Sequence, residues 1–161
     1  AGEHQVENAL AAAIALDLLH VSPGGIANTR WPARLERVHA NPDIILDGAH
    51  NPAGARALAA YIRRFYAERP VWLLFGAMRD KAIGEMAAIL FPLAQRVFAT
   101  APDNARAASA VEIRPADPPP VETGGSVREA VALALSAPPE TAVFFAGSLF
   151  LAGEARALLR K

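Results

Sequence analysis

The sequence has 161 residues, of which 53% are hydrophobic and 20% are charged, a balance that suits one folded domain with a core and excludes general disorder. Sixteen basic and sixteen acidic side chains cancel, so no overall charge would attract nucleic acid or an anionic membrane surface. The absence of cysteine excludes disulfides, thiolate catalysis and cysteine-ligated metal sites.

The first predicted element is an alanine- and leucine-rich helix at residues 3–20, whose apolar side chains repeat at helical spacing. Its most apolar stretch, residues 9–19, is too short to span a bilayer and contains Asp17, so no membrane segment is expected. Residues 21–25 contain proline and glycine and are expected to end the helix as a linker. Because the sequence starts at Ala1 without an initiator methionine, we expect a fragment of a longer protein.

The rest of the chain alternates predicted strands and helices, separated by turn-forming residues. In chain order we expect a strand at residues 35–39, a strand at 43–47, a helix at 52–68, a strand at 71–75, a helix at 83–90, a strand at 96–100, a short helix at 105–111, the start of a strand at 112–113, a loop at 115–122, a helix at 126–136, a strand at 141–146 and a helix from 148 to 161. Ser126 is the expected N-cap of its helix, and Glu129 completes a capping box.

This alternation predicts an α/β fold with a doubly wound, mostly parallel, Rossmann-like sheet and helices on both faces. Sheets of this kind bind ligands outside the carboxyl ends of their strands. In this chain those ends carry the polar, glycine- or proline-containing segments at residues 47–50, 76–81, 100–103 and 147–148. A ligand site is therefore expected along this edge of the sheet.

The segment from Asp47 to Pro52 joins a buried strand to a helix, and its residues leave two interpretations open. In the first, Gly48 lets the backbone approach a ligand, Asp47 accepts hydrogen bonds from a ribose or holds a cation, and His50 meets an anion at the helix N-terminus. In the second, Asp47 only caps the turn and His50 is an exposed loop residue.

Other polar residues also admit two interpretations. Lys81 follows a buried strand and suits a carboxylate or phosphate, although a solvated charge cluster is the alternative and is favoured for Arg79. Ser148 can donate its hydroxyl to a ligand or serve as a plain N-cap. For Arg34, before the first strand, and Asn8, on the polar side of the first helix, solvation is the default explanation.

Several motifs of complete catalytic sites are missing from the sequence. It contains no Gly-x-x-x-x-Gly-Lys-Ser/Thr phosphate loop, no Gly-x-Gly-x-x-Gly segment and no Gly-x-Ser-x-Gly elbow. Its four histidines lack a metal-binding spacing. The anion-binding segments therefore look like half of a site.

Five segments, in order along the chain, carry a resemblance to a known family. They are Gly2 to Ala9, Trp31 to Glu36, Asp-Gly-Ala-His-Asn-Pro at Asp47 to Pro52, Gly76 to Lys81, and Gly147 to Leu149 with Arg156. With them the chain resembles the folylpolyglutamate synthase/dihydrofolate synthase branch of the Mur ligase superfamily. Ala33 stands where that family usually has glycine, which is expected to affect the loop carrying Arg34, and Ala82 stands where an acidic residue is common.

The resemblance implies an ATP-dependent ligase that phosphorylates a carboxylate of dihydropteroate or of a folate, which the amine of L-glutamate then attacks. Arg34 and His50 are its catalytic candidates, and no metal ligand is expected in this chain. The binding roles that it implies are adenine for Asn8, the ATP phosphates for Arg34, the ribose side of the nucleotide for Asp47, the glutamate or the transferring phosphate for His50, and the glutamate carboxylate for Lys81 and Ser148.

The resemblance also implies a domain organisation. Residues 1–22 would be the last helix and linker of a preceding ATPase domain, and residues 23–161 the C-terminal glutamate ligase domain. The phosphate loop, the Mg²⁺ ligands and most of the pterin site would lie in that preceding domain, so this chain alone is expected to be inactive. A cytoplasmic enzyme without nucleic-acid or membrane partners is expected. The alternatives are a cell-wall amino-acid ligase of the same superfamily and a stand-alone nucleotide- or anion-binding module.

Overall fold

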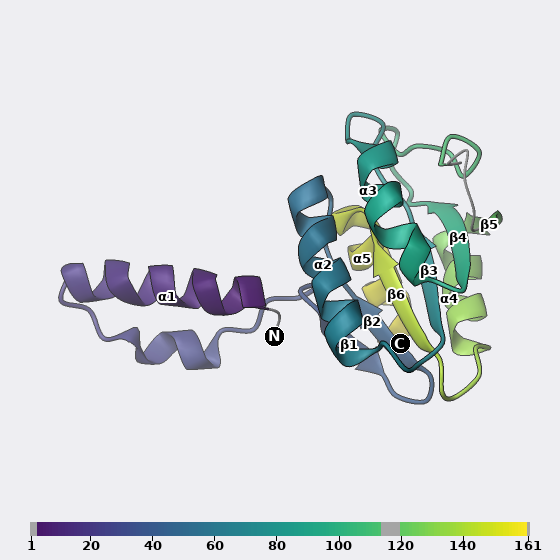
Figure 1. Cartoon of the computed structure of the whole chain (residues 1–161). Helices are drawn as coiled ribbons and strands as arrows, with labels where there is room; N and C mark the ends of the chain where they lie inside the picture. Colours follow the sequence, from purple (N-terminus) through teal and green to yellow (C-terminus); the bar gives the residue numbers. More distant parts are fainter. Residues whose placement is uncertain (1–2, 114–119, 161) are drawn as a thin grey trace.

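The computed structural model describes residues 3–113 and 120–160 of the chain. Figure 1 shows a helical arm that projects from an α/β body. The arm consists of helix α1 (Glu3–Leu18) and the 3-10 helix η1 (Pro23–Asn28), which runs back toward the body alongside α1. The predicted first helix is confirmed, and the predicted linker is partly 3-10 helical.

The described part of the body contains a six-stranded sheet in the order β1-β2-β6-β3-β4-β5. Its strands are β1 (Glu36–His39), β2 (Asp43–Leu46), β3 (Val71–Phe75), β4 (Arg96–Ala101), β5 (Val121–Ser126) and β6 (Ala142–Ala146). Strand β1 pairs with β2 in antiparallel fashion, and the other neighbouring strands are parallel. The prediction of a mostly parallel sheet is confirmed.

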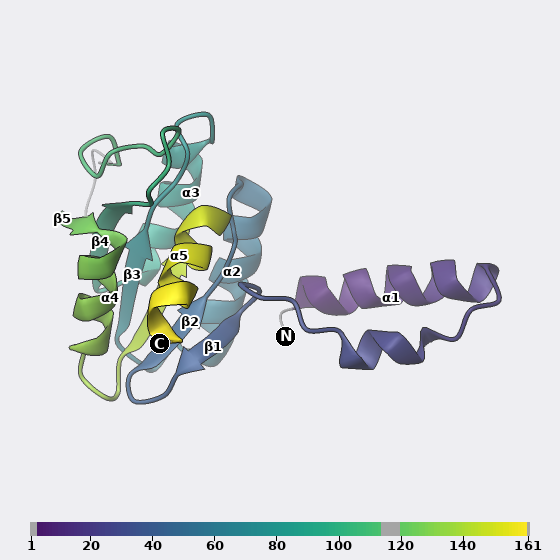
Figure 2. The same ribbon diagram turned by 180° about the vertical axis from the view of Figure 1, so that it is seen from behind.

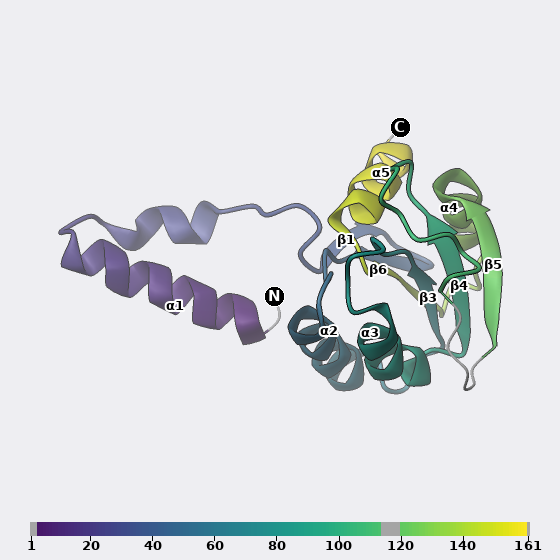
Figure 3. The same ribbon diagram turned by 90° about the horizontal axis from the view of Figure 1, so that it is seen from above.

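Helices cover both faces of the sheet, as Figures 1 and 2 show from opposite sides and Figure 3 shows from above. The helices are α2 (Pro52–Phe65) and α3 (Ile83–Leu90), extended by the 3-10 turn η2 (Phe91–Leu93), on one face, and α4 (Val127–Leu135) and α5 (Leu149–Leu159) on the other. Successive strand side chains point to opposite faces. Phe144 therefore packs in the α2–α3 layer and Phe145 in the α4–α5 layer. The doubly wound arrangement is confirmed.

Helix α2 ends at Phe65, three residues before its predicted end. Tyr66 leaves helical geometry and packs its ring edge-on against Phe144, with the ring centroids 5.2 Å apart. Arg69 then donates to the buried carboxylate of Asp43 at the start of β2. Packing against the sheet therefore ends the helix before Pro70 is reached.

The predicted helix at residues 105–111 and the predicted strand start at 112–113 are wrong. This segment instead pairs its backbone with the residues that follow β3. The Ala108 N–H donates to the Ala77 carbonyl, and the Arg79 N–H donates to the Arg106 carbonyl, both at 2.9 Å. Tertiary hydrogen bonds therefore override the helical preference of an alanine-rich sequence.

The predicted loop at residues 115–122 overlaps strand β5, which begins at Val121 and was not predicted. Residues 114–119 of that loop lie outside the described residues. The next prediction is confirmed, because Ser126 caps α4 and forms the full capping box with Glu129. The start of helix α4 was therefore predictable, although the edge strand before it was not.

The side chain of Arg96 links the edge strand β5 to the rest of the sheet. The Arg96 guanidinium lies 4.5 Å from the ring centroid of Trp72 and 4.6 Å from that of Phe98. It also makes a two-pronged ion pair with Glu122 of β5, at 2.8 and 2.9 Å. Two rings and a carboxylate thus hold one side chain across three neighbouring strands.

Candidate functional site

The carboxyl ends of β2, β6 and β3 continue to hydrogen-bond to one another beyond the strands. The Asp47 N–H donates to the Phe145 carbonyl at 3.0 Å, and the Gly147 N–H donates to the Ala49 carbonyl at 2.9 Å. The Gly76 N–H donates to the carbonyl of Ala146 at 3.1 Å. The structure therefore places the predicted segments after these three strands side by side on one edge.

Two glycines on this edge lie close to neighbouring segments. A Cβ on Gly48 would lie 2.3 Å from the Leu149 side chain and 3.3 Å from the Ala33 carbonyl oxygen. Gly147 has φ +104°, and a Cβ there would lie 2.7 Å from the Gly76 carbonyl oxygen. A side chain is therefore excluded at Gly147 by both its φ and the Gly76 backbone, whereas at Gly48 it would displace the flexible end of Leu149.

Asp47 lies deep in this edge, with 4% of its surface exposed. One carboxylate oxygen accepts a hydrogen bond from the Ala49 N–H at 2.9 Å, and the other accepts from the Leu35 N–H at 3.0 Å. The carboxylate thus ties its own turn to the segment that carries Arg34. This geometry supports an anchoring role for Asp47, and its predicted contact with ribose stays a prediction.

His50 is half-buried at the start of α2. Its Nδ1 lies 2.8 Å from the Gly48 carbonyl oxygen, and because a carbonyl only accepts, Nδ1 carries the proton. Asn51 caps α2 by accepting a hydrogen bond from the Gly54 N–H at 2.8 Å. The ring of His50 is therefore oriented by its own turn, with Nε2 as its second polar atom.

A cleft of about 400 Å³ lies between the start of α1 and the segment that leads into β1. The residues that line it include Gln5, Asn8, Ile26, Thr29, Trp31 and Arg34. The structure therefore brings together Asn8 and Arg34, the two residues predicted to contact one nucleotide. Trp31 is 67% exposed beside them, so an aromatic surface, an amide and a guanidinium meet in the same space.

The segment that carries Arg34 has an unusual backbone. Its neighbours Ala33 and Leu35 have φ values of +56° and +50°, a left-handed conformation that costs roughly 1–2 kcal/mol for each residue with a side chain. Glycine adopts such a positive φ more easily than alanine, which agrees with the glycine that the family resemblance implies at position 33. The alanine keeps this conformation here, and its carbonyl accepts a hydrogen bond from the Gly48 N–H at 2.7 Å.

Lys81 and Ser148 follow the neighbouring strands β3 and β6. The Lys81 ammonium pairs with Asp80 at 3.0 Å, and Asp80 also pairs with Arg106 at 2.9 Å. Ser148 is buried and caps α5 by accepting a hydrogen bond from the Phe150 N–H at 3.1 Å. Capping uses an oxygen lone pair and not the hydroxyl hydrogen, and the predicted contact of Ser148 with glutamate stays a prediction.

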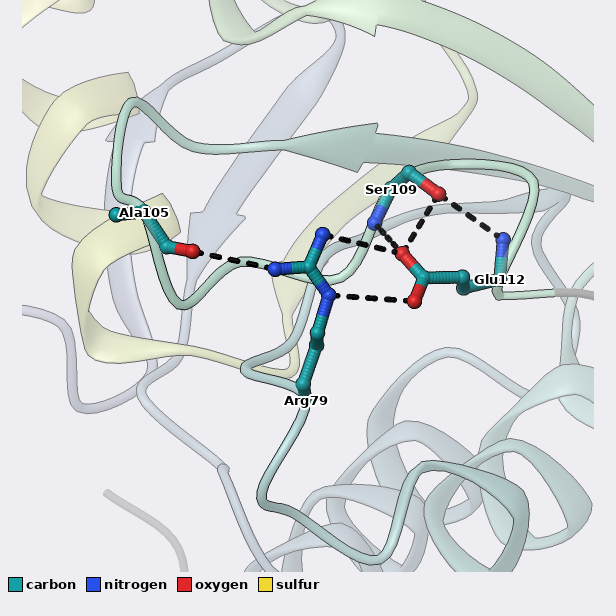
Figure 4. Close-up of polar contacts among 4 residues, drawn as sticks. All are labelled: Arg79, Ala105, Ser109 and Glu112. Atoms are coloured by element: carbon teal, nitrogen blue, oxygen red, sulfur yellow. Dashed lines mark hydrogen bonds and ion pairs between the residues drawn. The ribbon is translucent and has the colours of Figure 1, made fainter.

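Arg79 lies in a hydrogen-bonded cluster with Ala105, Ser109 and Glu112, here called the bracket, which the sequence did not predict (Figure 4). Its guanidinium pairs with both carboxylate oxygens of Glu112, at 3.2 and 3.4 Å, and donates to the Ala105 carbonyl at 3.2 Å. Glu112 accepts two hydrogen bonds from Ser109, from its N–H and its hydroxyl, each at 2.7 Å. The Arg79 side chain is 56% exposed, which agrees with the favoured interpretation of a solvated charge, but its pairing with Glu112 was not predicted. The Ser-x-x-Glu spacing was the signal available for half of this bracket.

The bracket makes folding stability depend on pH. Hydrogen bonds from the Ser109 backbone and hydroxyl, followed by the Arg79 guanidinium, lower the pKa of Glu112 from 4.5 to about 2. A carboxyl group whose pKa is lower in the folded state stabilises the fold above its unfolded-state pKa, and this contribution is lost as the pH falls through the folded-state pKa. The loss for Glu112 therefore occurs between pH 4.5 and about 2.

We expect Glu112→Gln to reduce the free energy of unfolding near neutral pH, and the difference from the wild type to shrink toward pH 2. Chemical denaturation of both proteins across this pH range measures that difference. Glu85→Gln, which removes an exposed carboxylate from α3, is the matched control. A difference between Glu112→Gln and the wild type that stays constant with pH would contradict this prediction.

Residues 3–113 and 120–160 contain neither a candidate metal site nor a candidate membrane span. No group of three or more histidine, aspartate or glutamate side chains there is arranged to hold a metal ion. None of the helices described there is long and apolar enough to cross a membrane.

Residues 33–149 match the family model described as Mur ligase, glutamate ligase domain. A probable bifunctional folylpolyglutamate synthase/dihydropteroate synthase of Halobacterium salinarum is 40% identical, over 96% of this chain and 20% of its own length. A dihydrofolate synthase/folylpolyglutamate synthase of Bacillus subtilis is 31% identical, over 70% of this chain and 28% of its own length.

Solved structures are similar over most of the chain. The Mycobacterium tuberculosis folylpolyglutamate synthase complexed with ADP has a TM-score of 0.83 and 29% identity, over 99% of this chain and 41% of its own. The Yersinia pestis bifunctional folylpolyglutamate synthase/dihydrofolate synthase complexed with AMPPNP and Mn ion has a TM-score of 0.79 and 26% identity, over 93% of this chain and 38% of its own. The chain thus spans between one fifth and about two fifths of the length of these relatives.

Proposed function

The chain belongs to the Mur ligase family, as its glutamate ligase domain, and from this we propose that it is the C-terminal domain of an ATP-dependent ligase that adds L-glutamate to dihydropteroate, to folates or to both. The observation that carries the proposal is the cleft shared by Asn8 and Arg34, beside the Asp47 turn. The relatives matched over most of the chain support the choice of glutamate ligation.

In the proposed reaction, the γ-phosphoryl group of ATP is transferred to the substrate carboxylate, which gives an acyl phosphate and ADP. The glutamate amine attacks the acyl carbon and loses a proton, and the C–O bond to phosphate breaks as the amide forms. Arg34 would neutralise charge on the transferring phosphoryl group, a task that depends on positioning more than on covalent chemistry. His50 would lie near the transferring phosphate or the glutamate, and Lys81 and Ser148 would hold the glutamate carboxylate.

The helical arm supports the proposed domain division. Residues 1–22 would belong to a preceding ATPase domain, and residues 23–161 would form the glutamate ligase domain. Four apolar side chains at helical spacing on α1 are each more than half exposed, as expected of a helix that packs elsewhere: Val6, Leu10, Ile14 and Leu18. Closure of the two domains would exclude water from the acyl phosphate.

The reaction would also need the preceding ATPase domain. It would supply the phosphate loop, the ligands of Mg²⁺ and most of the pterin site, and this chain alone would not turn over. The Mn ion and AMPPNP named for the Yersinia pestis structure support a divalent ion beside the nucleotide in this family. The proposed enzyme is cytoplasmic.

The test is an assay of the intact polypeptide that contains this chain. We expect ADP release that requires L-glutamate together with dihydropteroate or tetrahydrofolate. Release with a muramyl-peptide substrate instead would favour a cell-wall ligase and overturn the folate assignment. Calorimetry of the isolated chain is expected to give weak ATP binding or none, since half of the contacts are missing. Tight binding there would favour a stand-alone nucleotide-binding module.

A further inference from the structure

Glu36 joins the segment that carries Arg34 to the last helix of the chain. Its Oε2 accepts a hydrogen bond from the Ala33 N–H at 2.9 Å. The Arg156 Nε lies 3.0 and 2.9 Å from its two carboxylate oxygens, and an Arg160 nitrogen lies 2.8 Å from Oε1. One carboxylate at the start of β1 therefore connects a loop N–H to Arg156 of α5 and to Arg160, which caps that helix.

This network is sheltered and charged. The Glu36 side chain is 17% exposed and that of Arg156 is 28% exposed, while Arg160 lies at the surface. Burial raises the pKa of Glu36, but the hydrogen bonds from Ala33 and Arg156 outweigh it and lower the pKa below its usual value. Glu36 is therefore ionised at neutral pH.

The segment needs such restraints, because Ala33 and Leu35 both have positive φ values and relax toward other conformations unless contacts hold them. Ala33 is held through its N–H by Glu36 and through its carbonyl by Gly48. Leu35 is held through its N–H by Asp47. Arg34 is the residue between these two fixed neighbours, so they set the direction in which its side chain leaves the backbone.

We propose that Glu36, held by Arg156, is a positioning residue that aims Arg34 into the cleft it shares with Asn8. This inference rests on the proposed function, which gives Arg34 its phosphate. Neutralising Glu36 weakens its bond to the Ala33 N–H and its ion pairs with α5, so Arg34 stays present but loses its fixed direction. The chemical step then slows, because a phosphoryl transfer depends on accurately placed positive charge.

The first measurement compares Glu36→Gln with the wild type in the intact enzyme. We expect kcat to fall by roughly tenfold or more, with a smaller change in KM for L-glutamate. The double variant with Arg34→Ala is expected to be no slower than Arg34→Ala alone, because a residue that acts through Arg34 has no effect without it. The inference would be overturned if Glu36→Gln lowered kcat as much in the Arg34→Ala background as in the wild type. An unchanged kcat in Glu36→Gln would overturn it as well.

The matched control is Glu122→Gln, which weakens an ion pair in which Arg96 also contacts both carboxylate oxygens. This pair lies at the opposite edge of the sheet from Glu36. It is expected to lower stability without lowering kcat. If Glu36→Gln does not fold, Arg156→Lys keeps the charge but loses the Nε contact with both oxygens, and the same double-variant comparison applies. Equal losses of kcat in Glu122→Gln and Glu36→Gln would point to general destabilisation and contradict the inference.

A second readout needs no turnover. Hydrogen exchange in the segment of residues 31–36, measured in the intact protein without nucleotide, is expected to be faster in Glu36→Gln and unchanged in Glu122→Gln. Unchanged exchange in Glu36→Gln would overturn the inference even if kcat fell. A wild-type enzyme without glutamate-dependent ADP release would instead remove the proposed function, and the inference with it.

Discussion

Replacement of Arg34 by alanine in the intact enzyme is expected to lower kcat by roughly 10²–10³-fold, the loss typical when one preorganised donor to a developing negative charge is removed. The structure supports this expectation because Arg34 lines the cleft while three hydrogen bonds to backbone atoms of its neighbours fix their positions. Steady-state kinetics with varied ATP and L-glutamate measure the effect. The change should fall on kcat more than on either KM, because the proposed contact strengthens in the transition state.

Two variants make this prediction specific. Arg34→Lys keeps the charge but loses the planar fork of donors, so its kcat should lie between those of Arg34→Ala and the wild type. Arg37→Ala removes a neighbouring arginine that is exposed and paired with Asp43. Its kcat should stay within about twofold of the wild type. If Arg34→Ala retained near-normal turnover, Arg34 would have no phosphate contact and the assignment would fail.

Replacement of Asp47 by alanine is expected to damage both stability and turnover. The change leaves the N–H groups of Leu35 and Ala49 without their carboxylate acceptor, which costs about 1–3 kcal/mol for the buried Ala49 group and less for the part-buried Leu35 group. We therefore expect the free energy of unfolding of the isolated chain to fall by about 2–4 kcal/mol. In the intact enzyme kcat should fall as well, because the segment that carries Arg34 loses the hydrogen bond between the Leu35 N–H and Asp47.

A second buried aspartate, at the beginning of β2, provides the control. Asp43 lies at the end of this strand opposite Asp47 and pairs with Arg37 and Arg69. Asp43→Ala should lower stability but leave kcat of the remaining folded enzyme unchanged. If Asp47→Ala raised only KM for ATP and left the isolated chain as stable as the wild type, Asp47 would be a nucleotide ligand and not an anchor.

Local sequence patterns predicted most of the fold because they indicate which segments are buried and where helices and strands begin and end. The apolar runs at residues 71–75 and 141–146 are buried strands, and the Ser126 capping box starts a helix where expected. The predictions failed where distant partners decide the structure. Residues 105–111 favour a helix by composition but pair with the end of β3, and the glycine-containing β5 is a strand because β4 lies beside it.

The same distinction applies to the site. The order of strands and turns was enough to predict that Asp47 and Ser148 would lie on one edge, since the carboxyl ends of parallel strands meet there. The Glu36–Arg156 pair could not be predicted, because its members are 120 residues apart and meet only through the packing of α5. The pairing of Arg79 with Glu112 depended in the same way on a loop that was predicted to be helical.

Strand β6 is the last strand along the chain, yet it lies between β2 and β3 near the middle of the sheet. A nascent chain that does not yet contain β6 therefore holds β2 and β3 without the strand that pairs with both of them. Neither β2 nor β3 can complete its hydrogen bonding until β6 emerges from the ribosome. The body is thus expected to fold only at the end of its own synthesis, and a premature stop before β6 leaves an aggregation-prone chain with two unpaired strand edges.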